Sequence, residues 1–234
     1  MNRKIILGLD DAGRGPVIGP LVISGVAIRA DMEDILLSIG VRDSKMLTPA
    51  RRTILFRRIE SVAEAIGLEI IYPKMIDYYV QNVRPGGLNR LEASVFSELI
   101  NEMSNYLCHD DISLVVYIDC PDIKTGRFKS WIYENISHKV KDKIEFIVEH
   151  KADAKYPVVS AASIIAKVVR DLEIEKIKKL YGECGSGYPS DYRTKLFLER
   201  LLRTCRKVPI VRYSWKTVRN MIASKGYSKL TEFL

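Results

Sequence analysis

Four aspartates occur at or just after the carboxyl ends of predicted strands: Asp10, Asp11, Asp119 and Asp153. Ligands of α/β sheets commonly bind beyond the carboxyl ends of the strands, so these side chains meet in one small volume if their strands are neighbours. Clustered carboxylates repel each other unless cations neutralise them, and their oxygens suit Mg²⁺ or Mn²⁺. Two such cations can hold a phosphodiester while water attacks the phosphorus in line. The pattern therefore predicts a metal-dependent hydrolytic site.

Each aspartate taken alone also fits an ordinary structural role. The adjacent pair can open a polar turn, Asp119 can cap the helix that follows it, and Asp153 can end a strand. His150, near Asp153, is open to two interpretations as well: a helper of the site, or a surface or core histidine. Convergence of the carboxylates in the fold distinguishes these alternatives.

A glycine-rich loop follows the adjacent aspartates and contains Gly13, Arg14 and Gly15. Glycine lets the backbone come close to a ligand, and arginine supplies a fixed cation for a phosphate or for a partner carboxylate. The glycines at residues 13–19 also resemble a dinucleotide-binding loop, but their spacing differs, prolines interrupt the segment and no helix follows. A nucleic-acid strand is the expected target.

Apolar β-branched runs alternate with segments of helical periodicity along the chain. Strands are predicted at residues 4–9, 20–28, 68–73, 113–120 and 143–150. Helices are predicted at residues 48–66, 88–107, 127–140, 157–182, 191–204 and 214–224. The alternation predicts an α/β fold with helices packed on a sheet, and the apolar stripes of the helices are expected to form its core.

Composition limits the class of protein. The 234 residues suit one domain with a smaller appendage better than two equal domains. A net charge of +8 favours a polyanionic partner. The four cysteines lack the spacing of a disulfide framework or a zinc site. The N-terminal apolar run is too short for a signal peptide and no window approaches a membrane span, so we expect a cytoplasmic protein that binds no membrane.

Six stretches, in the expected order, resemble one family: type 2 ribonuclease H, or ribonuclease HII, of the archaeal and eukaryotic-like kind. They are LDDAGRGPVIGPLVI (9–23), DSKMLT (43–48), VYIDCPD (116–122), HKADAKYPVVSAASIIAKVVRD (150–171), GSGYPSD (185–191) and SWKTV (214–218). The resemblance implies a ribonuclease H-like catalytic domain at residues 1–184, with a central mixed sheet flanked by helices. It also implies a small helical C-terminal subdomain at residues 185–234.

The same resemblance implies an endoribonuclease that cleaves the RNA strand of RNA–DNA hybrids and incises duplex DNA on the 5′ side of embedded ribonucleotides. Hydrolysis with two Mg²⁺ or Mn²⁺ ions leaves 3′-hydroxyl and 5′-phosphate ends. The family's catalytic, metal-binding positions fall on Asp10, Asp11, Asp119 and Asp153. The family usually has Glu where this chain has Asp11. The shorter side chain is expected to change metal spacing and to give a slower or Mn²⁺-preferring enzyme.

Substrate recognition is implied at two further motifs. Gly13, Arg14 and Gly15 match the segment that reads the 2′-hydroxyl at an RNA-to-DNA junction, and Tyr188 matches the tyrosine that stacks on the next deoxyribose. A 2′-hydroxyl both donates and accepts hydrogen bonds, so close backbone groups can read it. The alternative for Tyr188 is a loop residue that covers apolar surface.

Three basic residues are candidates for contacts with nucleic-acid phosphates. Lys45 matches the lysine of the family's DSK motif and is expected to bind substrate. For Lys167 and Arg170, on the helix after the last aspartate, a solvated helix face is an equally good explanation.

The end of the chain resembles a short clamp-binding motif. Leu230, Phe233 and Leu234 have the spacing by which replication proteins, including archaeal members of this family, dock on the sliding clamp. Tyr227 stands where that motif usually starts with Gln. A fraying terminus with a few apolar residues is the alternative.

Two other functions remain as alternatives. Another ribonuclease H-like nuclease, such as a junction resolvase, would share the carboxylates but has no need of a loop and a tyrosine that read one 2′-hydroxyl. A basic protein that binds RNA–DNA hybrids without cutting them would follow if Asp11 had abolished catalysis. A panel of substrates separates all three.

Overall fold

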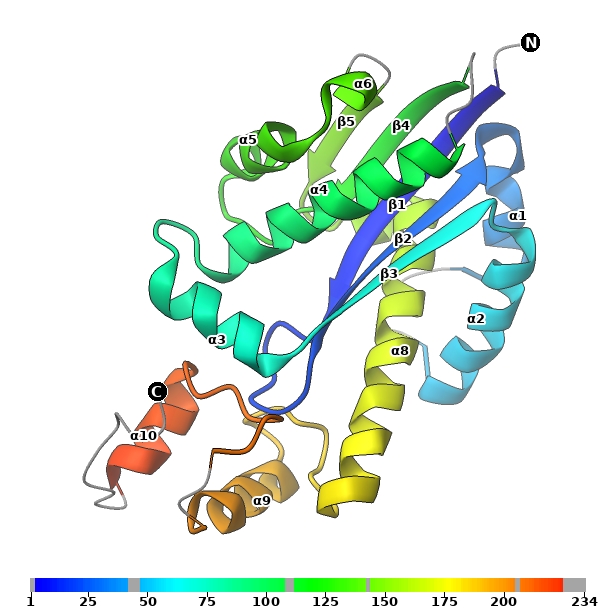
Figure 1. Ribbon diagram of the computed structural model, residues 1–234. Helices are drawn as coiled ribbons and strands as arrows, with labels where there is room; N and C mark the ends of the chain where they lie inside the picture. Colours follow the sequence, from blue (N-terminus) through cyan, green and yellow to red (C-terminus); the bar gives the residue numbers. More distant parts are fainter. Residues whose placement is uncertain (1–2, 42–46, 108–111, 142–143, 205–206, 225–234) are drawn as a thin grey trace. The chain divides into compact units, whose positions relative to one another are not determined.

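The computed structural model describes residues 3–41, 47–107, 112–141, 144–204 and 207–224, and its sheet has the strand order β3-β2-β1-β4-β5 (Figure 1). The strands are β1 (Arg3–Ala12), β2 (Leu21–Arg29), β3 (Ala65–Ile71), β4 (Ile112–Asp119) and β5 (Ile144–Glu149). β1 is antiparallel to β2 and parallel to β4, and β4 is parallel to β5. The predicted α/β class, with a mixed sheet, is therefore confirmed.

Helices cover both faces of the sheet, and this is why β1 is apolar on both sides. α4 (Leu88–Leu107) covers one face, while α2 (Pro49–Val62) and the first half of α8 (Pro157–Tyr181) cover the other (Figure 1). Side chains alternate along a strand, so Ile6, Gly8 and Asp10 share one face of β1. Ile6 belongs to the apolar cluster formed with α2 and α8. Asp10 therefore faces α8.

One predicted helix boundary is wrong by several residues. The helix expected at residues 48–66 ends at Val62, and residues 65–67 instead begin β3. A Cβ built on Gly67 would lie only 2.8 Å from Sδ of Met103 in α4. The edge strand therefore packs closely against α4 at Gly67, a tertiary contact that the local pattern does not reveal.

The helix expected at residues 127–140 is in fact two helices, α5 (Thr125–Asn135) and α6 (His138–Lys141). The side chain of Asn101 in α4 holds the break between them. It donates to the backbone oxygen of Asn135 and accepts from the backbone N–H of Ser137, both at 3.0 Å. A helix-like sequence pattern is thereby interrupted by a polar contact from a distant segment.

Several short elements were not expected from the sequence: a 3₁₀ turn (Ala30–Met32), α1 (Glu33–Ser38), α3 (Pro73–Asn82) and α7 (Ala152–Lys155). The remaining helices, α9 (Tyr192–Leu202) and α10 (Lys216–Ser224), agree with the predicted segments. Within the described ranges, no helix combines the length and apolar character needed to cross a membrane.

The chain packs as two compact units. The first takes its described residues from Met1–Ala12, Val22–Glu69 and Asn89–Val168, and the second from Gly13–Leu21, Ile70–Leu88 and Val169–Leu234. The first contains the sheet core, and the second has its own apolar cluster around α9 and α10. The boundary expected after residue 184 stays a prediction, because packing alone does not test where a folding domain ends.

Gly8 allows α8 to lie directly on β1, and we predict that enlarging it destabilises the protein. A Cβ on Gly8 would meet backbone atoms of Val158 and Val159 at 2.4–2.5 Å. Gly8→Ala should therefore lower the free energy of unfolding by about 2 kcal/mol or more, measured by urea denaturation.

Gly126, in the first turn of α5, is the matched control, since a Cβ there meets nothing within 4 Å. Gly126→Ala should leave stability unchanged or raise it by up to about 1 kcal/mol. Equal unfolding midpoints for the two variants would contradict the close approach of β1 and α8.

Candidate active site

The carboxyl ends of β1 and β4 place two aspartates next to each other. Leu9 pairs with Ile118 in the parallel register, so Asp10 and Asp119 occupy neighbouring positions one residue further on. Only 5% of the surface of Asp10 is exposed, whereas Asp119 is half-buried. The strand adjacency on which the predicted site depends is therefore present for these two carboxylates.

A polar pair on α8 faces Asp10. Ser163 is fully buried and makes a side-chain hydrogen bond with Asp10, and Nζ of Lys167 donates to Oγ of Ser163 at 2.5 Å. Residues four apart lie one turn apart on the same helix face. The sequence alone predicts no role for Ser163, and for Lys167 it predicts a contact with phosphate or a solvated position. The four-residue spacing was the one available signal.

The environment of Asp10 disfavours its charge. Burial raises its pKa well above the usual value, and the negative charges of Asp11 and Asp119 raise it further. The hydrogen bond with Ser163 and the positive charge of Lys167 act in the opposite direction with smaller effect. Oδ1 of Asp10 also accepts from the backbone N–H of Asp11 at 2.7 Å. A bound cation would remove this electrostatic cost.

Asp153 lies in the short helix α7 rather than in the loop expected from the sequence. Lys151 has a left-handed backbone with φ of 56°, and Ala152 donates its N–H to Oδ1 of Asp119 at 2.8 Å. Asp153 is the residue after Ala152, and only 4% of its surface is exposed. The hydrogen bond ties the turn that carries Asp153 to the end of β4, so Asp119 and Asp153 are linked through one residue.

Asp10, Asp11 and Asp119 lie near one another, and the turn that carries Asp153 is bonded to Asp119, but the four side chains do not form a closed set of metal ligands. In the part of the chain that the structure describes, no three His, Cys, Asp or Glu side chains are close enough to hold a metal ion. The chemistry of the donors nevertheless fits Mg²⁺ or Mn²⁺, because all are carboxylate oxygens. The charge repulsion at Asp10 also favours a cation. Side-chain rotations would have to complete such a site.

In the second unit, the glycine-rich loop lies against Tyr188. Gly13 has φ of 99°, a conformation that favours glycine. A Cβ built on Gly15 would lie 3.3 Å from Cε1 of Tyr188, so the backbone at Gly15 lies close to this ring. Arg14 is half-buried, and Tyr188 is 39% exposed. The two motifs that were expected to read the ribonucleotide are thus side by side.

Two buried arginines hold these loops in place. Nη2 of Arg170 donates to the oxygen of Ser186 at 2.7 Å, and its guanidinium lies 5.0 Å from the ring centre of Tyr188. Arg212 donates to the backbone oxygens of Gly19 and Arg14 at 3.0 and 3.1 Å. The expectation of a solvated face for Arg170 is wrong because it is only 7% exposed, whereas the phosphate contact stays a prediction. Arg212 had no sequence signal.

Asp191 organises the loop that carries Tyr188 from its other end. Its Oδ2 accepts from the N–H of Ser186 at 2.8 Å, and its Oδ1 accepts from the N–H of Arg193 at 2.9 Å. These hydrogen bonds, with the bond from Ser186 the largest contribution, lower the pKa of Asp191 to about 2. Asp191 is also the N-cap of α9, so the loop and the helix share one anchor.

Some predicted site residues lie outside the described ranges: Lys45, Leu230, Phe233 and Leu234. Their roles as substrate-binding and partner-binding residues stay predictions. His150 is described; it is exposed, and its Nδ1 lies 3.2 Å from the backbone oxygen of Cys120. The exposure of His150 and its contact with the backbone fit the interpretation of a surface histidine.

Solved structures define the class of the fold. The chain matches a crystal structure of ribonuclease H2 from Pyrococcus horikoshii OT3 with a TM-score of 0.81 and 42% identity, covering 94% of this chain and 98% of that one. It matches the ribonuclease HII in a complex with PCNA from Archaeoglobus fulgidus with a TM-score of 0.78 and 36% identity, covering 92% and 96%. The fold is thus that of a ribonuclease H.

Sequence comparison narrows the class to one family. The profile of the family Ribonuclease HII matches residues 7–218. A ribonuclease HII from Pyrococcus furiosus is 46% identical over 215 residues, which span 92% of this chain and 89% of that protein. The chain belongs to the ribonuclease HII family and is a ribonuclease H enzyme.

The raised pKa of Asp10 predicts a stability gain on removal of its charge. The folded protein holds the proton of Asp10 more tightly than the unfolded chain, so stability falls as pH rises from the ordinary pKa of 3.8 through the raised value. Asp10→Asn removes this cost and can still accept from the N–H of Asp11. Without divalent metal at neutral pH, it should melt higher than the wild type, by about 2–4 °C per kcal/mol relieved.

Thermal unfolding in a chelating buffer measures this difference, and the gain should shrink as the pH is lowered toward 3.8. The exposed Asp34, changed to Asn, serves as the control for loss of one negative charge. An Asp10→Asn melting temperature equal to or below that of the wild type at neutral pH would contradict the assigned electrostatic cost.

Proposed function

We propose that the protein is an endoribonuclease that cuts the RNA strand of RNA–DNA hybrids and incises duplex DNA on the 5′ side of an embedded ribonucleotide. The products carry 3′-hydroxyl and 5′-phosphate ends. The observation that carries the proposal is the buried Asp10 beside Asp119 at the carboxyl edge of the sheet. Membership of the ribonuclease HII family supports the same activity. The proposed role is the removal of ribonucleotides during DNA replication and repair.

The aspartates supply the catalytic part of the proposal. Asp10, Asp11, Asp119 and Asp153 would hold two Mg²⁺ or Mn²⁺ ions, which when bound activate water and stabilise the leaving oxygen. Ser163 donates to Asp10 and so orients its carboxylate, while Lys167 limits the repulsion among the carboxylates. The hydrogen bond from Ala152 fixes one oxygen of Asp119.

The glycine-rich loop and Tyr188 supply the proposed selectivity. The loop begins at Gly13, two residues after Asp11. A proposed catalytic carboxylate and the backbone proposed to read the ribonucleotide are therefore close in the sequence. The backbone at Gly15, which carries no side chain, can approach a 2′-hydroxyl closely, and DNA lacks this group. The half-exposed ring of Tyr188 offers an apolar face to the neighbouring sugar. Arg170 and Arg212 keep both loops in this arrangement.

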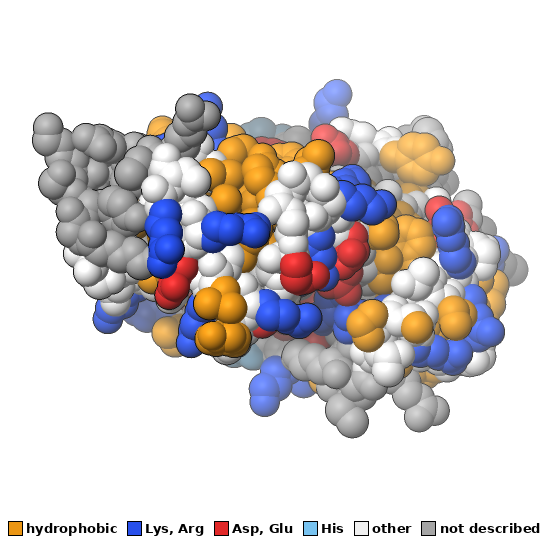
Figure 2. Space-filling model, turned by 90° about the horizontal axis from the view of Figure 1, so that it is seen from below, with side chains coloured by type: hydrophobic (Ala, Val, Ile, Leu, Met, Phe, Trp, Pro, Cys, Tyr) orange, Lys and Arg blue, Asp and Glu red, His pale blue; other side chains and the backbone are white. Residues whose placement is uncertain are grey.

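Charge supports a nucleic-acid substrate. The chain has a net charge of +8, and Figure 2 shows Lys and Arg side chains spread over one face, with fewer acidic side chains among them. Basic side chains that neutralise phosphates release counterions, so affinity for the duplex should fall steeply with added salt. Lys45 is proposed as one of the phosphate contacts on the strength of its DSK motif.

A duplex with one embedded ribonucleotide tests the proposed function directly. With Mg²⁺ or Mn²⁺, the wild type should make a single cut on the 5′ side of the ribonucleotide and leave an all-DNA duplex intact. Asp119→Asn should abolish cutting. Tyr188→Ala should slow it by about fivefold to a hundredfold, the usual range for loss of an aromatic stacking contact. The cut is mapped to the nucleotide on a sequencing gel.

Tyr192→Ala is the matched control, because Tyr192 is also an exposed tyrosine of the second unit, at 70% exposure. Asp11→Glu, assayed in both metals, tests the departure from the family pattern and should be faster or less dependent on Mn²⁺. Binding without cutting in either metal would refute the enzymatic proposal and favour a hybrid-binding protein. Cutting of branched DNA without ribonucleotides would favour a junction nuclease.

We further propose that the C-terminal tail docks on a sliding clamp. The ribonuclease HII from Archaeoglobus fulgidus has been solved in complex with PCNA. The tail residues with the spacing of a clamp-binding motif are Leu230, Phe233 and Leu234, which lie outside the described ranges. Short apolar motifs of this kind bind by inserting a few anchor side chains into a pocket.

Calorimetry with the sliding clamp from the organism that encodes this chain tests the proposed partner. The full chain should bind, and a chain that ends at Lys225 should lose at least about tenfold in affinity, because anchor residues carry most of the binding energy. Leu196→Ala removes an exposed leucine of α9 and should leave binding unchanged. Equal affinities of the full and shortened chains would exclude the tail as the docking element.

A further inference from the structure

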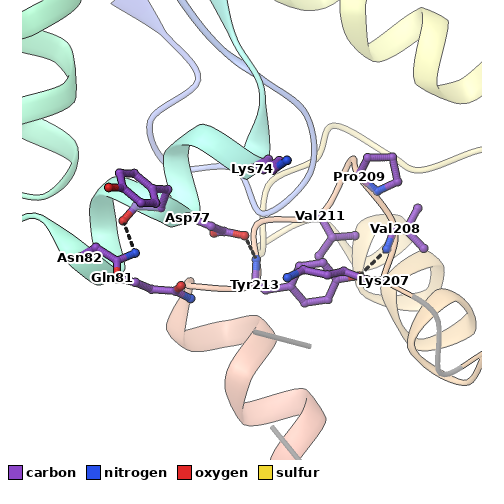
Figure 3. Close-up of a pocket in the computed structure, with 10 residues that line it drawn as sticks. Lys74, Asp77, Gln81, Asn82, Lys207, Val208, Pro209, Val211 and Tyr213 are labelled. Carbon is purple, nitrogen blue, oxygen red and sulfur yellow. Dashed lines mark hydrogen bonds between the residues drawn. The ribbon is translucent and has the colours of Figure 1, made fainter. Parts of the chain in front are cut away.

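A pocket in the second unit takes no part in the chemistry proposed above. It is a cavity of about 470 Å³ between α3 and residues 207–213, within the range of about 300–1,000 Å³ typical of small-molecule sites (Figure 3). Its lining residues are Lys74, Asp77, Tyr78, Gln81, Asn82, Lys207, Val208, Pro209, Val211 and Tyr213.

The pocket is preformed because Asp77 joins its two walls. Oδ2 of Asp77 accepts from the N–H of Tyr213 at 2.8 Å (Figure 3). Oδ1 of Asp77 accepts from the N–H and hydroxyl of Ser214 at 2.9 and 2.5 Å. The hydroxyl of Tyr213 accepts in turn from the N–H of Val208 at 2.8 Å. Three hydrogen-bond donors therefore satisfy the carboxylate of Asp77. They fix the loop of residues 207–214 against α3 without a ligand.

The charged groups of the pocket favour an anion. Lys74 and Lys207 stand on the opposite walls, both exposed, and the one lining carboxylate is already bonded to three donors. A metal cation would be repelled by the two ammonium groups, which contribute no ligand atoms. A phosphate group suits this pair, since lysine binds phosphate as a point charge without demanding fixed geometry.

The other lining residues favour a flat heterocycle beside that phosphate. Val208, Pro209 and Val211 form an apolar wall on one side, and Tyr78, with 57% of its surface exposed, is among the lining residues from α3. Gln81 carries a carboxamide, which both donates and accepts hydrogen bonds and can therefore read the edge of a base. Aromatic faces and carboxamides are the groups that recognise unstacked bases.

We propose that this pocket binds one nucleoside monophosphate unit, with its phosphate at Lys74 and Lys207 and its base between Tyr78 and the apolar wall. The unit belongs either to a single-stranded stretch of nucleic acid or to a free nucleotide. The inference goes beyond cleavage of a hybrid, and binding here requires neither the carboxylates nor a divalent metal.

Titration of ¹⁵N-labelled protein in a chelating buffer, followed by NMR, tests the proposal without cleavage. Adenosine 5′-monophosphate should shift the amide signals of residues 74–82 and 207–213 saturably. Adenosine alone and inorganic phosphate alone should each bind those residues at least about fivefold more weakly, because each offers only part of the contacts. A single-stranded thymidine trinucleotide is the second nucleotide probe.

Substitutions in the pocket make the test specific. Lys74→Ala and Lys207→Ala should each weaken binding of the monophosphate by about threefold to tenfold, as expected for loss of one charged contact near the surface. Lys179→Ala, at an exposed lysine of α8, should have no effect. Val208→Trp should fill the cavity and abolish the shifts; should this variant not fold, the two exposed lysine substitutions still decide.

The probes also separate the two sources of the nucleotide. Tighter binding of the trinucleotide would identify a single strand as the occupant, and tighter binding of the monophosphate would identify a free nucleotide; both support the site. The absence of saturable shifts in residues 74–82 and 207–213 at about 10 mM of both nucleotide probes would overturn it. Equal binding of inorganic phosphate would also overturn it, since the pocket would then hold only an anion.

Discussion

The electrostatic cost of a buried carboxylate at the end of β1 is the constraint on which the first unit depends. Asp10 faces α8, beside Asp119, in a place where burial and like charges both disfavour ionisation. Ser163 and Lys167 offset part of that cost. Such an arrangement lowers stability, and carboxylates with perturbed pKa values of this kind are common at catalytic sites. Gly8 makes it possible, because it lets α8 come close enough to reach the carboxylate.

In the second unit, the main constraint is the positioning of two loops that contain proposed recognition residues. The segment of Gly13 and Gly15 and the loop of Tyr188 have little regular structure of their own, so side chains must fix them. Arg170 and Arg212, both buried, donate to backbone oxygens of these loops. Buried guanidinium groups are costly to leave unbonded, so the loops and the arginines stabilise each other. Asp77 plays the corresponding role for the pocket of α3.

The errors in the predicted elements share one physical cause. Residues 65–66 continue the predicted helix, yet they begin a strand in which Gly67 packs tightly against α4. Residues 136–137 interrupt a helical pattern because Asn101 bonds to the backbone on both sides of the break. At both places the chain contacts side chains more than 30 residues away. Local propensity is weak enough for such contacts to override it.

The sequence by itself determined the class of fold, the placement of Asp10 and Asp119 near the ends of two strands in the chain pattern, and the family, because hydrophobic periodicity and short motifs are local properties. Only the tertiary structure decided which strands are neighbours and which groups surround Asp10. It also revealed Ser163 as a partner of that carboxylate and Arg212 as an anchor of the glycine-rich loop. The burial and the raised pKa of Asp10 and the anchoring of the glycine-rich loop arise from contacts between segments distant in the chain. Residue spacing along one sequence does not predict such contacts.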